Sequence, residues 1–345
     1  MRIKFFIVIL ILTSFLFAES EFDFKGQLIG VPNISHNNDE YKINGYIQYL
    51  PMVEYSEYLD KLNYSFDVAG NFMTNFESSP DAKLYRMKFS ISNDQNEFRI
   101  GLQKLNFGPA QVLRSLQWFD TMSPTDPLKL TDGVYGALYR HYFLNNNNIW
   151  LWSLYGNDER KGIEMYETKE NTFEFGGRTQ MMLLNGEVGF TLHHRQLYFD
   201  TEQKLAIDGR WDYIIGSWFE AVAQVNDNMQ MALITLGTDY TFGIGNGIYV
   251  MNEHLITQAD YNGSFKTEIP QVSSIMIAYP FTLFDTFSSI TYYSWETEEL
   301  SQYFSWQRTY DNIILNLNLF HFPKNSTNPG NMAGNGIEFK IIYNH

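Results

Sequence analysis

The sequence predicts an all-β protein that forms a single transmembrane, antiparallel, up-and-down β-barrel of about 18 strands, with about 16 as the lower bound. Apolar and polar residues alternate with a period of two in one segment after another, which gives each strand one wet and one greasy face. Short turns and longer polar connections take turns along the chain, as short periplasmic turns and longer outer loops do in a membrane barrel. The N-terminus has the pattern of an export signal.

The first twenty residues form the predicted signal peptide. Arg2 and Lys4 precede the apolar run 5–17, and Ala18 and Ser20 supply small residues for cleavage. Cleavage after Ser20 is preferred, with cleavage after Ala18 as the alternative. The apolar run is too short to cross a bilayer as a helix. Residues 1–20 are therefore expected to be removed, and residues 21–345 to form the barrel in the outer membrane of a Gram-negative cell.

Composition excludes several classes of function. The chain has no cysteine, which removes lipoprotein anchoring and thiol chemistry. Removing residues 1–20 lowers the Lys+Arg count from 24 to 22 and the Asp+Glu count from 39 to 38, so the mature net charge is −16. Nucleic-acid binding needs a basic face, and none is expected here.

The clearest strand is 62–68, where Leu62, Tyr64, Phe66 and Val68 form the apolar face and polar residues form the other. The same alternation continues to the C-terminus. The strands expected from it are 21–30, 41–54, 62–74, 83–92, 97–104, 133–144, 149–156, 172–184, 187–195, 204–213, 217–225, 230–242, 247–257, 271–280, 286–296, 302–310, 312–320 and 336–344.

Longer polar connections are expected at 31–40, 75–82, 105–132, 157–171, 196–203, 258–270 and 321–335. The longest, 105–132, contains three prolines and a short helix-like patch around 112–119. A soluble β-sandwich is the alternative fold, but its core would be aliphatic. Here the apolar faces carry many of the 23 Tyr and 28 Phe residues, as in the aromatic girdles of membrane barrels.

The final strand alternates Ile337, Phe339, Ile341 and Tyr343 with polar residues. It resembles the C-terminal strand that bacterial outer-membrane proteins present to their insertion machinery, although the chain ends in His345 where a Phe is usual. Together with the signal and the alternating strands, this pattern resembles the porin-like outer-membrane barrels. The alginate-export and capsule-assembly barrels are similar at the same level.

In general porins a long loop after the fifth strand folds inward and narrows the pore, and 105–132 also follows the fifth expected strand. The Pro-Glu-Phe-Gly-Gly signature of that porin loop is absent. The resemblance implies outer-membrane lipid and lipopolysaccharide, the insertion machinery and small hydrophilic solutes as partners. It also implies the homo-oligomers common among porins, without identifying an interface, and it implies no cofactor or metal.

Placing the apolar face against lipid turns the other face inward. A basic stripe facing acids across a narrow opening would set up a transverse field that filters solutes. In the alternative interpretation these charges pair and only keep the interior wet and rigid. The pore-lining candidates are Arg86, Lys88, Arg99, Arg140, Arg178, Arg195, Arg210, Asp208, Asp212, Glu220, Asp239 and Glu253.

Within 105–132, Arg114, Trp118 and Asp120 are the candidates for a constriction. Charge and an indole face could meet a solute there. In the alternative interpretation Trp118 packs the loop against the inner wall, which is the preferred reading for the apolar residues.

An enzyme is not expected. His193 and His194 are adjacent strand residues that point to opposite faces, so they do not chelate one ion. No nucleophile elbow, HExxH or EF-hand motif occurs. The sequence leaves open a barrel hydrolase with catalytic residues on outer loops. The expected function is passive diffusion of small hydrophilic solutes, anions among them, and the alternative is surface-polysaccharide export or assembly.

Overall fold

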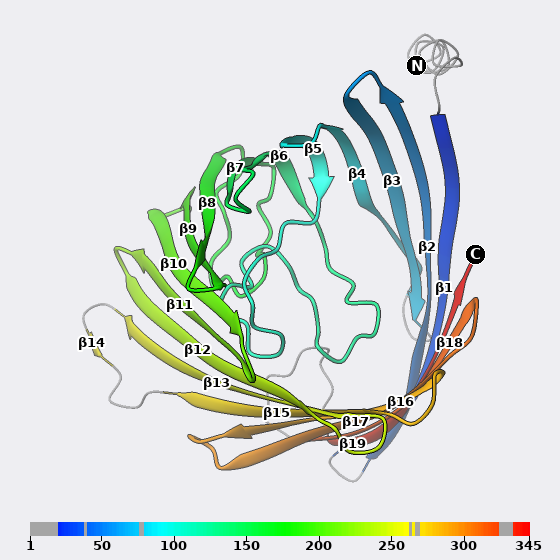
Figure 1. The fold of residues 1–345 in the computed structure, drawn as a ribbon. Helices are drawn as coiled ribbons and strands as arrows, with labels where there is room; N and C mark the ends of the chain where they lie inside the picture. The colour runs from blue at the N-terminus through cyan, green and yellow to red at the C-terminus, as the bar shows by residue number, and fades with distance from the viewer. Residues whose placement is uncertain (1–19, 38–39, 76–78, 262–263, 266–269, 324–333) are drawn as a thin grey trace.

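The alternating segments form a closed antiparallel barrel in a computed structural model of the chain (Figure 1). The structure describes residues 20–37, 40–75, 79–261, 264–265, 270–323 and 334–345. The strands are β1 (Ser20–Asn37), β2 (Glu40–Leu59), β3 (Leu62–Asn75), β4 (Asp81–Ser92), β5 (Asn96–Gln103), β6 (Val134–Tyr142), β7 (Asn148–Tyr155), β8 (Phe173–Leu183), β9 (Gly186–Gln196), β10 (Thr201–Asp212), β11 (Gly216–Asn226), β12 (Met229–Phe242), β13 (Ile248–Tyr261), β14 (Ser264–Phe265), β15 (Gln271–Pro280), β16 (Asp285–Ser294), β17 (Glu299–Thr309), β18 (Ile313–Phe322) and β19 (Gly334–Asn344).

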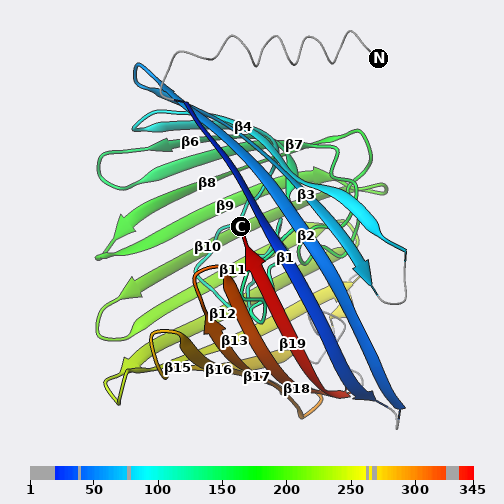
Figure 2. The same cartoon turned by 90° about the vertical axis from the view of Figure 1, so that its right-hand side faces the viewer.

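Eighteen of these strands make up the wall, and the two-residue β14 pairs antiparallel with the end of β13. Each wall strand pairs with its neighbours in sequence, and β15 follows β13 in the wall. The ring closes where β1 pairs with β19, with Gln27 opposite Asn344. Figure 2 shows β1, β2 and β19 side by side at this seam. Closure leaves no wall strand with an unpaired edge, as a sheet in lipid requires.

The predicted strands and the short turns between them are confirmed, and the differences lie at strand ends. The segment 31–40 was expected to be a loop, but β1 continues to Asn37 and pairs with β2 as far as Glu40. The expected loop 196–203 is also shorter, because β10 begins at Thr201. Polar residues at strand ends hide the alternation there, while pairing with a long neighbour continues the strand.

The helix-like patch expected around 112–119 is wrong, since the segment has no helix and follows a series of bends. Its apolar residues contact the inside of the barrel instead of lining one helical face. No helix in the described part of the chain is long and apolar enough to cross a membrane. The predicted signal, residues 1–20, lies outside the described residues except for Ser20, which begins β1.

Alternation along the strands separates two faces of the wall. On β12 the buried and exposed residues alternate from Met229 to Thr238. The outer face exposes residues such as Leu236 at 51% and Phe190 at 44%, while the inner face buries Leu233 and Thr235. The outer surface is thus apolar around the wall, which suits contact with lipid acyl chains.

Candidate functional site

The long connection between β5 and β6, residues 104–133, lies inside the ring of strands (Figure 1). Two carboxylates of the far wall hold its first part by accepting backbone hydrogen bonds. Glu220 on β11 accepts from the amides of Ala110 at 3.0 Å and Leu116 at 2.8 Å. Because Glu220 is fully buried, its oxygens have no water to bind, and the two loop amides supply the hydrogen bonds that they need.

Glu253 on β13 holds the next residues of the same connection. Its carboxylate accepts from the amides of Gln111 at 2.7 Å, Val112 at 2.9 Å and Leu113 at 2.6 Å. The indole of Trp218 donates to the same carboxylate at 3.1 Å. Three successive amides aimed at one carboxylate fix the backbone path of the loop against β13.

Gly108 is required where the loop passes Glu220. Its φ is +93°, a left-handed conformation that side chains rarely adopt. A Cβ at this position would also collide with the Glu220 carboxylate. The close approach of loop and wall therefore depends on a residue without a side chain.

Apolar side chains from residues 105–120 also pack against the inner face of the wall. Phe107, Trp118 and Phe119 pack with Trp152 of β7 in edge and stacked contacts. The core they form extends over inward residues of β6, β7, β11 and β12. Trp118 is 1% exposed, so its ring is not available to a passing solute.

A second connection, residues 156–172 between β7 and β8, contacts this core with a buried charge network. Glu164 lies between Lys204 Nζ at 2.9 Å, Arg195 Nη1 at 2.9 Å and Lys161 Nζ at 3.4 Å. Burial alone would raise the pKa of Glu164, but the charges of Lys204, Lys161 and Arg195 outweigh it and lower the pKa to about 2. The carboxylate therefore remains charged at neutral pH.

Together these two connections close one side of the interior. We call the interior along β5–β13 the closed half, because residues 104–120 and 156–172 fill it. The two fillings also contact each other, since the amide of Ile163 donates to the carbonyl oxygen of Gln117 at 3.0 Å.

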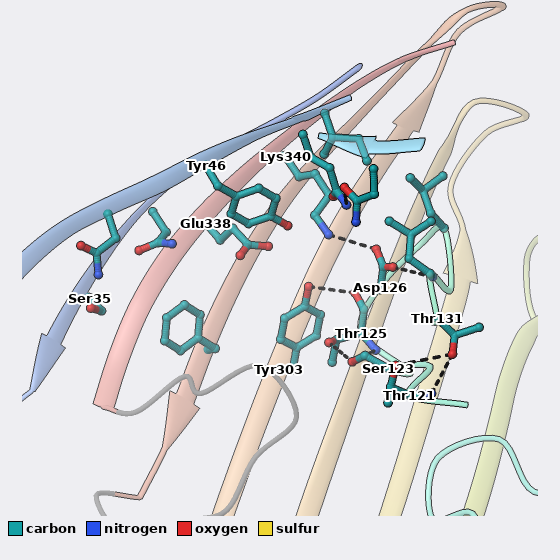
Figure 3. A pocket seen from close by; sticks show the side chains of 18 of the residues that line it. Ser35, Tyr46, Thr121, Ser123, Thr125, Asp126, Thr131, Tyr303, Glu338 and Lys340 are labelled. Atoms are coloured by element: carbon teal, nitrogen blue, oxygen red, sulfur yellow. Dashed lines mark hydrogen bonds and ion pairs between the residues drawn. The ribbon is translucent and has the colours of Figure 1, made fainter. Parts of the chain in front are cut away.

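On the other side of the interior lies a cavity of about 710 Å³ (Figure 3). We call this side, along β1–β4 and β17–β19, the open half. One wall of the cavity is the second part of the long connection, residues 121–132, with hydroxyl groups from Thr121, Ser123 and Thr125. The opposite wall comes from polar strand residues. Those on β1–β3 are Asn33, Ser35, Glu40, Lys42, Asn44, Tyr46, Gln48 and Asn71, and those on β17–β19 include Tyr303, Glu338 and Lys340.

Contacts from β19, β17 and β4 hold residues 121–132 at the edge of the cavity. Lys340 Nζ of β19 contacts Asp126 Oδ1 at 3.1 Å, and the hydroxyl of Tyr303 donates to the carbonyl oxygen of Thr125 at 3.3 Å (Figure 3). On the β4 side, Arg86 Nη2 donates to the carbonyl oxygen of Thr131 at 2.6 Å. Residues 121–132 are thus held by β17 and β19 on one side and by β4 on the other, and residues from both sides line the cavity.

The basic pore-lining candidates lie on the inner side of the wall, and most have a partner. Lys88 contacts Asp67 at 2.7 Å, Arg140 contacts Glu97 at 3.5 Å, and Arg178 Nη2 donates to Asp208 Oδ1 at 2.8 Å. Arg99 also pairs with Glu97, Arg195 with Glu164 and Glu202, and Arg210 with Asp212 and Asp239. Arg86 instead binds the carbonyl oxygens of Tyr85 and Thr131. These basic side chains thus contact neighbouring carboxylates or backbone carbonyl oxygens, the geometry expected if the inward charges pair with one another.

None of the twelve pore-lining candidates lines the 710 Å³ cavity. The constriction candidates do not line it either; they lie in the closed half, where Arg114 forms a bidentate ion pair with Asp120, with 3.0 Å between Nη2 and Oδ2. Of that loop, Asp126 and the hydroxyl residues border the cavity instead. One sequence signal could have identified two of the cavity residues, because Glu338 and Lys340 alternate with apolar residues on the last strand.

His193 and His194 point to opposite faces, as expected from strand geometry. Inside the closed half the indole of Trp152 donates to Nδ1 of His193 at 3.2 Å, and Nε2 of His193 donates to Glu174 Oε2 at 3.1 Å. Across the described residues no group of three or more His, Cys, Asp or Glu side chains is arranged to hold a metal ion.

Comparison with solved structures gives the class of the fold. OccK2 (OpdF) of Pseudomonas aeruginosa, solved in complex with glucuronate, matches over 94% of this chain and 97% of its own, with TM-score 0.64 and 10% identity. OccAB2 of Acinetobacter baumannii matches over 94% and 98%, with TM-score 0.62 and 8% identity. OmpT of Vibrio cholerae, an outer-membrane protein in a trimer form, matches over 94% and 99%, with TM-score 0.55 and 11% identity.

The chain therefore has the fold of an outer-membrane β-barrel of 18 strands. Within that class it resembles the Occ barrels over nearly its whole length. No family model and no curated protein matches the sequence. Identities of 8–11% mean that the likeness is one of fold, and the solute has to be argued from this chain's own residues.

Proposed function

We propose that the protein is an outer-membrane channel for passive diffusion of small hydrophilic solutes, and that the solutes pass through the open half. The observation that carries the proposal is the polar cavity of about 710 Å³ between residues 121–132 and the strands β1–β3 and β17–β19. Its size suits small molecules, which fill pockets of roughly 300–1,000 Å³. A polysaccharide chain needs a longer continuous groove, so the export alternative has less support.

In this proposal the long connection has two tasks. Residues 104–120 and the second connection remove the closed half from the route, because their contacts there are dry and close-packed. Residues 121–132 border what is left and set its width. The contacts of Asp126 and Tyr303 keep that border in place without a moving plug.

The same proposal places the chain in the outer membrane after export by its N-terminal segment. The apolar outer face and the closed ring support this location. Glucuronate is bound by OccK2 and a trimer form is described for OmpT. A small hydrophilic solute and a homo-oligomer are accordingly reasonable starting points for experiments on this chain.

Single-channel recording in planar bilayers tests the proposal with a pair of neighbouring substitutions on β1. Ser35 faces the cavity, and Ile34 lies on the outer face with 50% exposure. Ser35→Trp should lower the conductance and slow liposome swelling with small sugars, because the indole enters the cavity. Ile34→Trp, which adds the same ring on the lipid side, should leave both unchanged. Folded wild-type protein that inserts without open-pore currents would overturn the proposal.

A further inference from the structure

The charged groups around the cavity are unequal in sign. Its lining includes four carboxylates, from Glu40, Asp126, Asp132 and Glu338, and two ammonium groups, from Lys42 and Lys340. Lys340 forms an ion pair with Asp126 at 3.1 Å. Asp132 forms one at 2.7 Å with Lys83, which does not line the cavity. Within the described residues Glu40 and Glu338 have no ion-pair partner, so the cavity retains an excess of negative charge.

Glu338 is the best placed of these groups. It is 5% exposed, accepts one hydrogen bond at 2.9 Å from Asn318, and points toward the cavity beside Tyr46 and Lys340 (Figure 3). A buried carboxylate needs a compensating charge, and Glu338 has none within 4 Å in the described part of the chain. A cation that enters the cavity would supply that charge.

A second cavity of about 270 Å³ is lined by β1, β2 and β3, near the turn that joins β2 to β3. Its lining includes Glu21, Asp23, Glu54 and Asp67, with Lys25 as its one basic residue. Asp23, Glu54 and Asp67 stand directly opposite one another on β1, β2 and β3. Lys25 contacts Asp23 at 2.8 Å and Glu54 at 2.9 Å, and Lys88 contacts Asp67 at 2.7 Å.

Like charges directly opposite on neighbouring strands destabilise a sheet. The row of Asp23, Glu54 and Asp67 therefore does not stabilise β1–β3 by itself. The ion pairs with Lys25 and Lys88 only offset the repulsion between the carboxylates. The row lies on the inner face, as the cavity lined by Glu338 does. Two cavities on one set of strands thus carry the same sign, which points to a common role in the passage of charge.

Aromatic rings accompany the carboxylates. The rings of Tyr46 and Tyr303 lie on the two sides of Glu338 and line the cavity (Figure 3). Aromatic faces attract ammonium groups, and desolvation strengthens that attraction. A small organic cation could thus meet a carboxylate and a ring at the same level of the open half.

We propose that the open half selects cations, primary ammonium compounds included, and that Glu338 is its principal specificity residue. The proposal rests on the proposed channel function and narrows its solute class. It differs from the expectation of anionic solutes, since the basic residues behind that expectation lie outside the cavity. Focusing of the field in a narrow, low-dielectric opening gives a few fixed charges a large effect on the passing ion.

The test is the reversal potential of the purified channel in a KCl gradient across a planar bilayer. The wild type should show preference for potassium over chloride. Glu338→Gln should lower the permeability ratio about twofold, as expected when one unit charge roughly 8 Å from the ion is removed in water and its effects on cation and anion, opposite in sign, are screened by salt. Glu187→Gln is the matched control, because Glu187 on β9 lines neither cavity and should leave the ratio unchanged.

A second measurement replaces potassium on one side with ethanolammonium. The proposal expects a bi-ionic potential that shows ethanolammonium entering the channel, and exclusion of this ion would overturn the assignment of ammonium compounds. A conducting channel that prefers chloride, or equal effects of Glu338→Gln and Glu187→Gln, would overturn cation selection while leaving the channel function intact. Absence of any open-pore current would overturn the channel function itself.

Discussion

The two halves of the interior use inward-facing charges in opposite ways. In the closed half, Glu220 and Glu253 accept hydrogen bonds from loop amides, and Glu164 binds three cations with no contact to water. In the open half, Glu338 borders a cavity, and among the described residues its one hydrogen-bond donor is Asn318. Position on the inner face therefore does not make a residue part of a pore; the docking of the loops decides it.

The comparison also shows what the loops require of the wall. A loop whose backbone amides have no partner within the loop can be buried only where the wall supplies hydrogen-bond acceptors, because an unpaired buried amide costs about 1–3 kcal/mol. Strands β11 and β13 supply those acceptors as carboxylates, and strands β6, β7 and β12 supply the apolar surface. Strands β1–β3 supply neither to the first part of the loop, and the space beside them stays open.

The same chemical change in each half should have very different effects on stability. Glu164→Gln leaves Lys204 and Arg195 buried with less compensation, and we expect it to lower the free energy of unfolding by about 3–5 kcal/mol. Glu338→Gln should lower it by about 1 kcal/mol or less, because the residue loses part of one hydrogen bond. Urea titration of the folded protein in phospholipid vesicles measures both. Equal losses would remove the distinction between the halves.

Acid should weaken the closed half through the same carboxylate. The pKa of Glu164 is lowered to about 2 from an ordinary value of 4.5, since its three cations outweigh the cost of burial. Its contribution is thus fully present above pH 4.5 and is lost as the pH falls toward about 2, a loss of about 3 kcal/mol. Unfolding measured over this range should show the decline in the wild type and in Glu338→Gln. In Glu164→Gln the decline should be smaller, and an identical slope would contradict this role for Glu164.

The wall could be predicted from the sequence because its signal is local. Alternation places each side chain on one face regardless of which strand lies next to it. All of the wall strands were found in this way, including the last one with Glu338 and Lys340. The errors lie at ends such as 31–37, where polar residues continue a strand that only its partner defines.

The residues that border the cavity could not be predicted because the causes of their position are long-range. Whether Arg178 meets a solute or Asp208 depends on the register between β8, β9 and β10. Whether Trp118 lines a pore or a core depends on where residues 104–120 dock, and no local pattern specifies Glu220 and Glu253 as their acceptors. Cavity residues that were not predicted, such as Tyr46 and Asn71, lie on the inner face like many others, and they border the cavity because neither connection packs over them.

Opposite changes to the Asp126–Lys340 pair should move ion selectivity in opposite directions. Asp126→Asn leaves the ammonium group of Lys340 at the cavity without its partner, and the preference for cations should fall about twofold. Lys340→Gln leaves the carboxylate of Asp126 instead, and the preference should rise by about the same factor. Reversal potentials in a KCl gradient measure both shifts. Two shifts of the same sign would show that the substitutions act by moving residues 121–132 and not by their charge.

The smallest effect is expected where the sequence suggested a filter. Arg99 belongs to the basic stripe of the inner face, but its guanidinium group pairs with Glu97 at 2.6 Å from Nε and does not line the cavity. Charges that are paired and away from the permeating ion contribute little to its energy. Arg99→Gln should therefore leave the reversal potential within the scatter of the wild type, in contrast to Lys340→Gln. A clear shift toward cations would restore the basic stripe as part of the conduction path and would place the route nearer β5 than the cavity does.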